Sequence, residues 1–329
     1  MIVTLTPNPS LDRSISVTKL NPGEVHRALD NRVDPGGKGV NVSRALAANG
    51  HATVAVLPAA GADATLFASL LDEAGVAYDF LPLAGAVRTN ITLVETGGST
   101  TKLNELGRPA RTGDAASLLE IVDNHSGGAD WVVGCGSLPP GMGGRLYADL
   151  IERAHARGVK VAIDTSGDAL SAAIAAQPDL IKPNREELEE FVGSPLATLG
   201  DVLDAARAVV SQGIGTVVVS LGADGALAVD STTAVHAWAR AENPSSTVGA
   251  GDCLLAGFLS AVTAGASIVD AIGTGVRWGT AAIMLPGSKV PAPADLAMVA
   301  VTVSENPQLS SPLSESSLVS ASTTRKGSS

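Results

Sequence analysis

The stretch Thr247-Val-Gly-Ala-Gly-Asp252, followed at once by Cys-Leu-Leu-Ala-Gly-Phe-Leu, joins a glycine turn to an apolar helix. Gly249 and Gly251 allow a tight turn in which several backbone N–H groups point at one spot. Those groups lie at a helix N-terminus, where the helix dipole favours negative charge. The residues Gly249, Ala250 and Gly251 therefore predict an anion-binding cradle with the carboxylate of Asp252 at its edge. Phosphoryl transfer requires this combination of donors and base, but Asp252 could also be a simple N-cap.

Composition narrows the class of protein. The chain has 329 residues, of which 45% are hydrophobic and 3% aromatic, so a large core of aliphatic side chains is expected. A net charge of −11 argues against nucleic-acid binding. No apolar stretch reaches the roughly 18 residues of a membrane span, and the N-terminus resembles no signal peptide, so we expect a soluble cytoplasmic protein. Cys135 and Cys253 have no spacing typical of a disulfide framework or metal knuckle.

Short apolar runs alternate with longer periodic segments along the chain. This alternation predicts an α/β fold in which a mostly parallel sheet is covered by helices on both faces. The expected strands are residues 2–5, 52–57, 131–135, 159–163, 180–182 and 216–221, and the expected helices are 40–49, 65–74, 114–124, 145–156, 185–191, 203–212, 252–264 and 268–284.

Two segments do not fit that alternation. Residues 13–33 and 87–102 show strand-like patterns with turn signals at Asn21-Pro-Gly23 and Gly97-Gly98, which predict a small separate β-sheet acting as a lid. A last short helix is expected at 294–303. Residues 304–329 are rich in Ser and Thr without periodicity, which predicts a disordered tail.

The segment Asp34-Pro-Gly-Gly-Lys-Gly-Val-Asn41 precedes the first long helix. It lacks the spacing of a Walker phosphate loop. Its glycines, including Gly37, would bring backbone close to a ligand, Lys38 offers charge, and Asn41 offers both donors and acceptors. A flexible strand-to-helix turn is the alternative interpretation.

The segment Lys182-Pro-Asn-Arg-Glu-Glu187 places Asn184 and Glu187 three residues apart in a first helical turn. Oxygen ligands so placed could hold magnesium through water. The same pair could equally form a capping box, in which Asn184 caps the helix and Glu187 reaches back.

Other polar positions give weaker signals. The turn from Ser220 to Gly225 suits either a hairpin or backbone laid along a nucleotide, and Ser137 lies in a rigid Gly/Pro loop after a strand, where ligand sites of parallel sheets are found. Asp12 is suited to sugar hydroxyls and Arg88 to a phosphate, with Asn90 beside it in the expected lid.

Together and in this order, these motifs resemble the PfkB branch of the ribokinase-like carbohydrate kinases. The resemblance covers the chain to about residue 300 and rests on the pairing of Gly36-Gly-Lys-Gly-Val-Asn41 with Gly249-Ala-Gly-Asp252. The segments Thr6–Asp12, Gly136–Gly141 and Lys182–Leu188 are similar to the phosphofructokinase and tagatose-6-phosphate kinase subgroup. Lys102-Leu-Asn-Glu-Leu-Gly107 is similar to the Asn-Glu-Pro-Gly segment of bacterial 1-phosphofructokinases, with Leu106 in place of the proline.

The resemblance implies a ribokinase-like three-layer αβα sandwich with a small β lid over residues 1–303, and a role for each matching position. Asp252 would be the base, and the cradle would hold the transferred phosphoryl group. ATP and Mg²⁺ are implied as cofactors, a sugar phosphate as substrate, and a homodimer formed through the lid, where Arg27 is a candidate to act across the contact. Substrate binding is implied for Asp12, Gly37, Lys38, Asn41, Arg88, Asn90 and Ser137, nucleotide binding for Lys182, Asn184, Ser220, Leu221, Gly222, Ala223, Asp224, Gly225 and Gly251, and ordering of the metal for Glu187.

The implied reaction is ATP-dependent phosphorylation of fructose 1-phosphate to fructose 1,6-bisphosphate. The nearest alternatives are 6-phosphofructokinase and tagatose-6-phosphate kinase. A nucleoside or unphosphorylated-sugar kinase would leave Lys38 and Arg88 without a phosphate to bind. A non-catalytic sugar-phosphate sensor would be expected to lack the base or the glycine cradle, and both are intact here.

Overall fold

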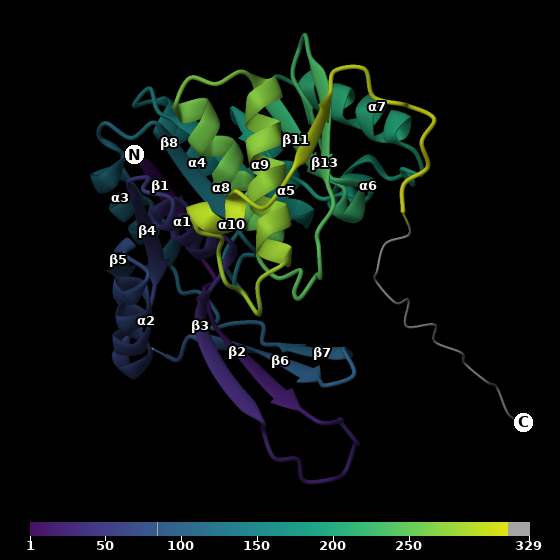
Figure 1. Ribbon diagram of the computed structural model, residues 1–329. Coiled ribbons are helices and arrows are strands. Elements are labelled where there is room, and N and C mark those ends of the chain that lie inside the picture. The colour runs from purple at the N-terminus through teal and green to yellow at the C-terminus, as the bar shows by residue number, and fades with distance from the viewer. Residues whose placement is uncertain (84, 315–329) are drawn as a thin grey trace, which may run out of the picture.

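A ten-stranded sheet forms the centre of the computed structural model, which describes residues 1–83 and 85–314 (Figure 1). Its order is β14-β13-β12-β11-β10-β9-β8-β1-β4-β5. Seven neighbouring strands from β11 to β5 are parallel, and the last three pair antiparallel. The strands are β1 (Ile2–Leu5), β4 (Thr53–Pro58), β5 (Ala77–Leu81), β8 (Trp131–Cys135), β9 (Lys160–Asp164), β10 (Leu180–Ile181), β11 (Thr216–Ser220), β12 (Ala226–Val229), β13 (Ala234–Ala239) and β14 (Val301–Ser304).

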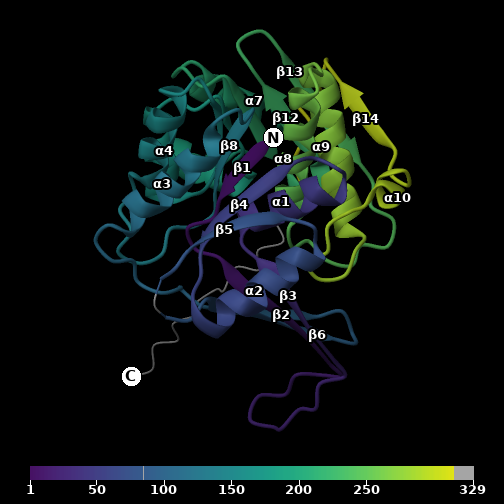
Figure 2. The same cartoon turned by 90° about the vertical axis from the view of Figure 1, so that its left-hand side faces the viewer.

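Helices cover both faces of this sheet, as Figure 2 shows in the view along its edge. The buried side chains of the parallel strands divide between two cores, one on each face, so the strands are apolar on both sides. One face carries α3 (Asp114–Ser126), α4 (Leu146–His155), α5 (Gly167–Ala175), α6 (Arg185–Val192) and α7 (Leu199–Val210), and the other carries α1 (Lys38–Ala48), α2 (Gly61–Glu73), α8 (Ala250–Thr263) and α9 (Ile268–Ile283). The three-layer α/β architecture expected from the sequence is confirmed, although α5, β5 and β13 were not anticipated.

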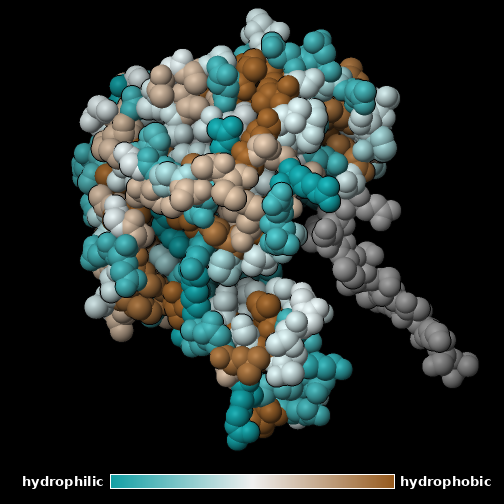
Figure 3. Space-filling model, in the orientation of Figure 1, coloured by the Kyte–Doolittle hydropathy of each residue, from teal (hydrophilic) through white to brown (hydrophobic). Residues whose placement is uncertain are grey.

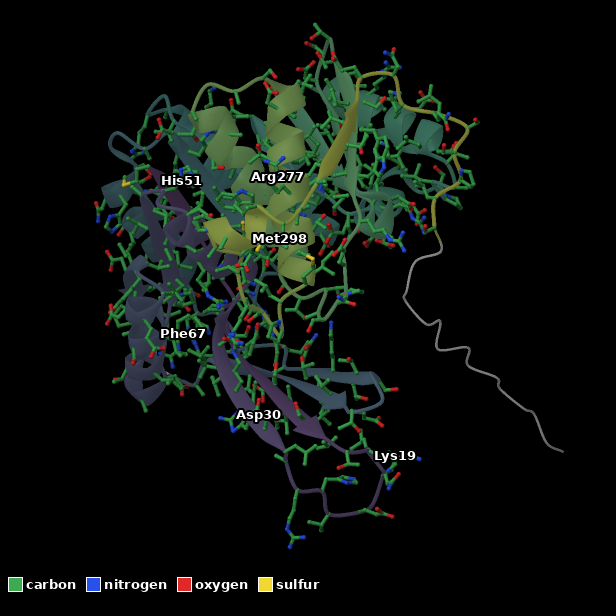
Figure 4. The ribbon with its side chains drawn as sticks, viewed as in Figure 1. Lys19, Asp30, His51, Phe67, Arg277 and Met298 are labelled. Carbon is green, nitrogen blue, oxygen red and sulfur yellow. The ribbon has the colours of Figure 1, made fainter. Side chains whose placement is uncertain are left out.

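A second sheet projects from one end of the main body (Figures 1 and 3). Its order is β3-β2-β6-β7, formed by β3 (Asp30–Gly36), β2 (Ser10–Val17), β6 (Arg88–Glu95) and β7 (Thr100–Asn104). Asp30 lies on this sheet and Lys19 on the loop between β2 and β3, whereas Phe67 lies on α2 (Figure 4). The two segments expected to form a separate lid sheet do so. β2 and β3 come from the first segment, and β2 pairs in parallel with β6 of the second.

The C-terminal part of the chain differs from the expectation. The helix predicted for residues 294–303 is limited to α10 (Pro293–Leu296), because the chain then extends as β14 and completes the edge of the sheet beside β13. Ser311 and Leu309 carbonyls accept hydrogen bonds from the start of α7, so the predicted disorder is not seen in residues 304–314. Residues 315–329 of the predicted tail lie outside the described residues. Across the described part of the chain, no helix has the length and apolar character needed to cross a membrane.

Candidate active site

The predicted glycine cradle lies at the N-terminus of α8. Gly249 is the N-cap residue with φ 77°, a left-handed conformation that favours glycine. The first N–H groups of a helix point out of its end, and here that of Ala250 has only a long contact of 3.5 Å, to the Thr247 carbonyl oxygen. Asp252 is the third helical residue, and no side chain caps this helix. The N-cap interpretation of Asp252 is therefore wrong, and its carboxylate is available for another contact.

That contact is made by Asn41 of α1. The Nδ2 of Asn41 donates to Oδ2 of Asp252 at 2.8 Å, in a site where both residues are buried. Burial raises the pKa of Asp252 to about 6, the nearby Asp164 adds to the rise, and the cations Lys38 and Lys182 partly offset it. A carboxylate with a raised pKa is a stronger base than an exposed one and is still ionised at neutral pH.

The pKa of Asp252 predicts the pH dependence of any reaction that uses it as a base. The ionised form accumulates as the pH rises through about 6, so kcat/KM should rise across that pH and level off above it. The hydrogen bond from Asn41 stabilises the ionised form of Asp252, so Asn41→Ala should raise the pH at which kcat/KM rises. If the rise came from ionisation of a substrate phosphate instead, this substitution would leave its pH unchanged. A rate profile from pH 5 to 9 tests both statements. An unshifted limb in Asn41→Ala would assign the titration to the substrate.

A buried carboxylate, Asp164, organises the cations of the site. It stands at the end of β9, and its oxygens contact Lys38 Nζ at 2.7 Å and Lys182 Nζ at 3.0 Å. Burial alone would raise the pKa of Asp164, but the two ammonium groups hold it below its ordinary value. Lys182 also approaches the cradle, because a Cβ on Gly251 would lie 3.3 Å from its Nζ. One carboxylate thus keeps two positive charges beside the anion cradle.

Asn184 and Glu187 form the capping box that was the alternative to a metal site. Asn184 accepts from the Glu187 N–H at 2.7 Å, and Glu187 Oε2 accepts from the Asn184 N–H at 2.9 Å. The second oxygen of Glu187 remains directed into the site, 3.5 Å from Lys38 Nζ. In the described chain no group of three or more His, Cys, Asp or Glu side chains could enclose a metal ion. This donor set fits a magnesium ion held through water and substrate phosphates better than a resident metal.

Asp12 forms the second polar cluster, where the lid meets the main body. Its Oδ1 accepts from Ser10 Oγ at 2.7 Å and from Asn90 Nδ2 at 2.9 Å. The pairing of β2 with β6 sets Asp12 opposite Asn90, and the pairing with β3 sets it opposite Asp34. Burial raises the pKa of Asp12. The cluster presents a hydrogen-bonded carboxylate of the kind that binds sugar hydroxyls.

Gly36 leaves the room that the Asp12 carboxylate occupies. A Cβ at this position would overlap that carboxylate, so Gly36→Ala should displace Asp12 and raise KM for the sugar substrate about 10-fold, as expected for the loss of one charged hydrogen bond. KM for the nucleotide should change little. Gly143→Ala is the matched control, because a Cβ there meets no atom within 4 Å. Equal KM values for both variants would exclude this role of Gly36.

Arg88 and Ser137 lie at the same edge, with their polar groups engaged by the protein. The Arg88 guanidinium donates to the carbonyl oxygens of Asn8 at 3.0 Å and Glu105 at 3.1 Å, so it ties the lid strand to two loops. Ser137 Oγ accepts from Asn8 Nδ2 at 3.3 Å. These contacts make Arg88 a structural tie as well as a candidate phosphate ligand.

The expected nucleotide turn joins β11 to β12. Ser220 pairs with Asn184, and residues Gly222–Asp224 form one turn of 3-10 helix that includes Ala223 and follows Leu221. Gly225 has φ 84°, and a Cβ there would overlap the Ala237 carbonyl oxygen. The Asp224 carboxylate accepts from Ser314 N at 2.7 Å and Oγ at 3.0 Å. The side chain of Asp224 therefore contacts the C-terminal segment, so the part this residue can offer a nucleotide is its backbone.

Sequence reasoning did not single out Asp164, Asn8 or Arg44. Asp164 directly follows the expected strand 159–163, and ligand sites of parallel sheets lie at the carboxyl ends of strands, so its position was a usable signal. Asn41 and Gly37 were expected to bind substrate. Asn41 contacts Asp252, and a Cβ on Gly37 would meet the Thr6 side chain at 2.6 Å.

Comparisons with known proteins identify the family of this chain. The model of the pfkB family carbohydrate kinases matches residues 8–295. The 1-phosphofructokinase of Rhodobacter capsulatus is 40% identical over 308 residues, covering 92% of this chain and 96% of that protein. The ATP-dependent 6-phosphofructokinase isozyme 2 of Escherichia coli is 35% identical over 292 residues, covering 88% and 94%.

Solved structures show the same fold. Phosphofructokinase-2 from Escherichia coli in complex with fructose-6-phosphate superimposes with a TM-score of 0.84 at 32% identity, covering 90% of this chain and 96% of that one. Ribokinase from Thermotoga maritima superimposes with a TM-score of 0.72 at 20% identity, covering 90% and 97%, which identifies the fold as ribokinase-like. The family model spans the glycine cradle, Asp252 and the lid sheet alike, and the chain belongs to the pfkB family of carbohydrate kinases.

Proposed function

We propose that this protein is an ATP-dependent sugar-phosphate kinase that converts fructose 1-phosphate to fructose 1,6-bisphosphate in the cytoplasm. The observation that carries the proposal is the buried carboxylate of Asp252 at the N-terminus of α8, beside a glycine cradle and two lysines. This arrangement supplies a base for a hydroxyl and a positive environment for phosphates. The names of the relatives support the choice of substrate.

In the proposed reaction Asp252 takes the proton of the C6 hydroxyl as that oxygen attacks the terminal phosphorus of ATP, and the bond from this phosphorus to the bridging oxygen breaks to release ADP. The N–H groups of Gly249, Ala250 and Gly251 stabilise the charge on the transferred group, each such donor being worth about 10²- to 10³-fold in rate. Lys182 and Lys38, both held by Asp164, place positive charge beside the phosphates. Magnesium would neutralise phosphate charge when bound, with Glu187 and Asn184 ordering its water.

The lid cluster would hold the sugar. Asp12 and Asn90 are placed to bind hydroxyls, and Arg88 is placed to bind the phosphate already on the substrate. Ser220 to Gly225 would carry the nucleotide along their backbone. The lid would also keep water out of the site, because water that reached the terminal phosphate could hydrolyse ATP.

The outer part of the lid supports a homodimer. Val25, Leu29 and Leu103 are exposed there, and apolar residues are visible on the lid in Figure 3. Val25 and Leu29 lie on the loop between β2 and β3, and Leu103 lies on β7. Exposed apolar side chains that gather on one part of a surface mark interaction sites. We therefore propose that two lids pack together. Sedimentation of Leu29→Asp beside the unaltered protein tests this, and an unchanged mass would exclude the lid as the contact.

The choice of substrate is tested by measuring ADP release with fructose 1-phosphate, fructose 6-phosphate and tagatose 6-phosphate. We expect the highest kcat/KM with fructose 1-phosphate. A preference for fructose 6-phosphate would instead place the chain with the relatives named 6-phosphofructokinase isozyme 2. Equal rates, or no turnover, on all three compounds would contradict the proposal.

A further inference from the structure

Arg44 is a buried cation on α1 that is linked to Asp252 through Asn41. The residue is 6% exposed, and it follows Asn41 by three residues, on the same face of the helix. Its Nη1 lies 3.1 Å from Asn41 Oδ1, 3.2 Å from the Pro35 carbonyl oxygen and 3.1 Å from the Ser288 carbonyl oxygen. One guanidinium therefore joins β3, α1 and the loop that follows α9.

This contact determines which way the Asn41 amide faces. Since Oδ1 accepts from Arg44, the NH₂ group must point to the other side, where it donates to Asp252 at 2.8 Å. An amide turned by 180° would set its oxygen against the carboxylate, and its NH₂ against the donors of Arg44. Neither contact would then contain a hydrogen bond. The orientation of the amide is thus fixed from the side away from Asp252.

The charge of Arg44 has partners of its own. Arg44 Nη2 lies 3.9 Å from Asp34 Oδ1, and the further charged groups around the guanidinium are Arg32 and Asp12. Arg32 also pairs with Asp34. A buried charge is costly to maintain, and a residue needed only for packing could be apolar. The buried charge of Arg44 is therefore best explained by the hydrogen bonds that its guanidinium donates to Asn41, Pro35 and Ser288.

We propose that Arg44 is a positioning residue for phosphoryl transfer, which acts through Asn41 to hold the carboxylate of Asp252 in its reactive orientation. The inference rests on the proposed function, because it requires Asp252 to be the base. In this proposal Arg44 touches neither substrate. Its effect on kcat passes through Asn41, so the effects of changing the two residues should not add.

A double-mutant cycle in the full-length chain tests the proposal, with Arg44→Met, Asn41→Ala and the combination. Arg44→Met should lower kcat about 10-fold, the usual effect of losing one charged hydrogen bond. KM for ATP and KM for the sugar phosphate should stay within about twofold, because the hydrogen bonds of Arg44 go to Pro35, Asn41 and Ser288 rather than to the Asp12 cluster or the glycine cradle. In the Asn41→Ala background the same substitution should have no further effect on kcat, because the pathway is already broken.

Two further variants keep the outcome decisive. Arg44→Lys keeps a charged donor beside Asn41 and Asp34, so it should retain more of kcat than Arg44→Met and remain folded if the apolar substitution does not. Asp252→Asn tests the base itself. An unchanged kcat in Arg44→Met, or effects of Arg44 and Asn41 that add, would overturn this inference while Asp252→Asn remains inactive. Full turnover by Asp252→Asn would instead overturn the proposed function.

Discussion

Asp252→Asn should lower kcat by about 10²- to 10⁴-fold, the range for removal of a positioned general base. The amide has nearly the shape of the carboxylate and can still accept the hydrogen bond of Asn41. It cannot take a proton from a hydroxyl. Initial rates at saturating ATP and sugar phosphate measure the effect, and a variant that keeps wild-type turnover would show that Asp252 is not the base.

Asp252→Asn should also make the protein more stable at pH 7. A variant that is inactive but more stable has lost the base and not the fold. The folded protein holds the proton of Asp252 more tightly than the unfolded chain does, since burial raises the pKa from 3.8 to about 6. Above that pH the ionised carboxylate therefore lowers the free energy of unfolding, and this cost is absent below pH 3.8. An amide carries no such cost. Thermal melts at pH 7 should show a higher Tm for Asp252→Asn, and a lower Tm would contradict the assigned pKa shift.

Asp164→Asn should lower the free energy of unfolding by about 3–5 kcal/mol, because breaking a buried ion pair leaves charge unpaired. Asp164 is 1% exposed and is the carboxylate partner of both Lys38 and Lys182. Lys182 is itself buried at 3% exposure, so its ammonium cannot turn to bulk water. Urea unfolding measures the effect. KM for ATP should also rise, since both lysines are placed beside the cradle by this carboxylate.

Asp149→Asn is the matched control for that variant. It breaks the pair between Asp149 and Arg145, whose side chains are 44% and 69% exposed. Pairs of this kind contribute about 0–1 kcal/mol because water screens them. If the two substitutions changed the free energy of unfolding by similar amounts, the buried cluster around Asp164 would not have the stabilising role assigned to it.

Much of the fold could be predicted from local pattern. Strand and helix alternation from Ile2 to Ser220 predicted the layered sheet because apolar runs of strand and helix length are local properties. The helix predicted for residues 294–303 was wrong for the opposite reason. Its last three residues belong to β14, which exists because β13 offers an unpaired edge. Tertiary pairing of this kind overrides helix propensity and leaves no signal in a short window.

The site shows the same division between local and distant contacts. The capping box of Asn184 and Glu187 lies within one helical turn, and the sequence predicted it as one of two possibilities. The contact between Asn41 and Asp252 spans 211 positions, and that between Lys38 and Asp164 spans 126. No spacing rule connects residues so far apart.

The sequence by itself determined which groups are present: a glycine turn at a helix start, a carboxylate three residues after Gly249, and a few cations in an acidic chain. Only the tertiary structure decided how each group is used. It freed Asp252 from capping, committed Asp224 to Ser314, and set Asp164 between two lysines. The physical reason is that pKa values and hydrogen-bond partners depend on burial and on neighbours brought together by folding.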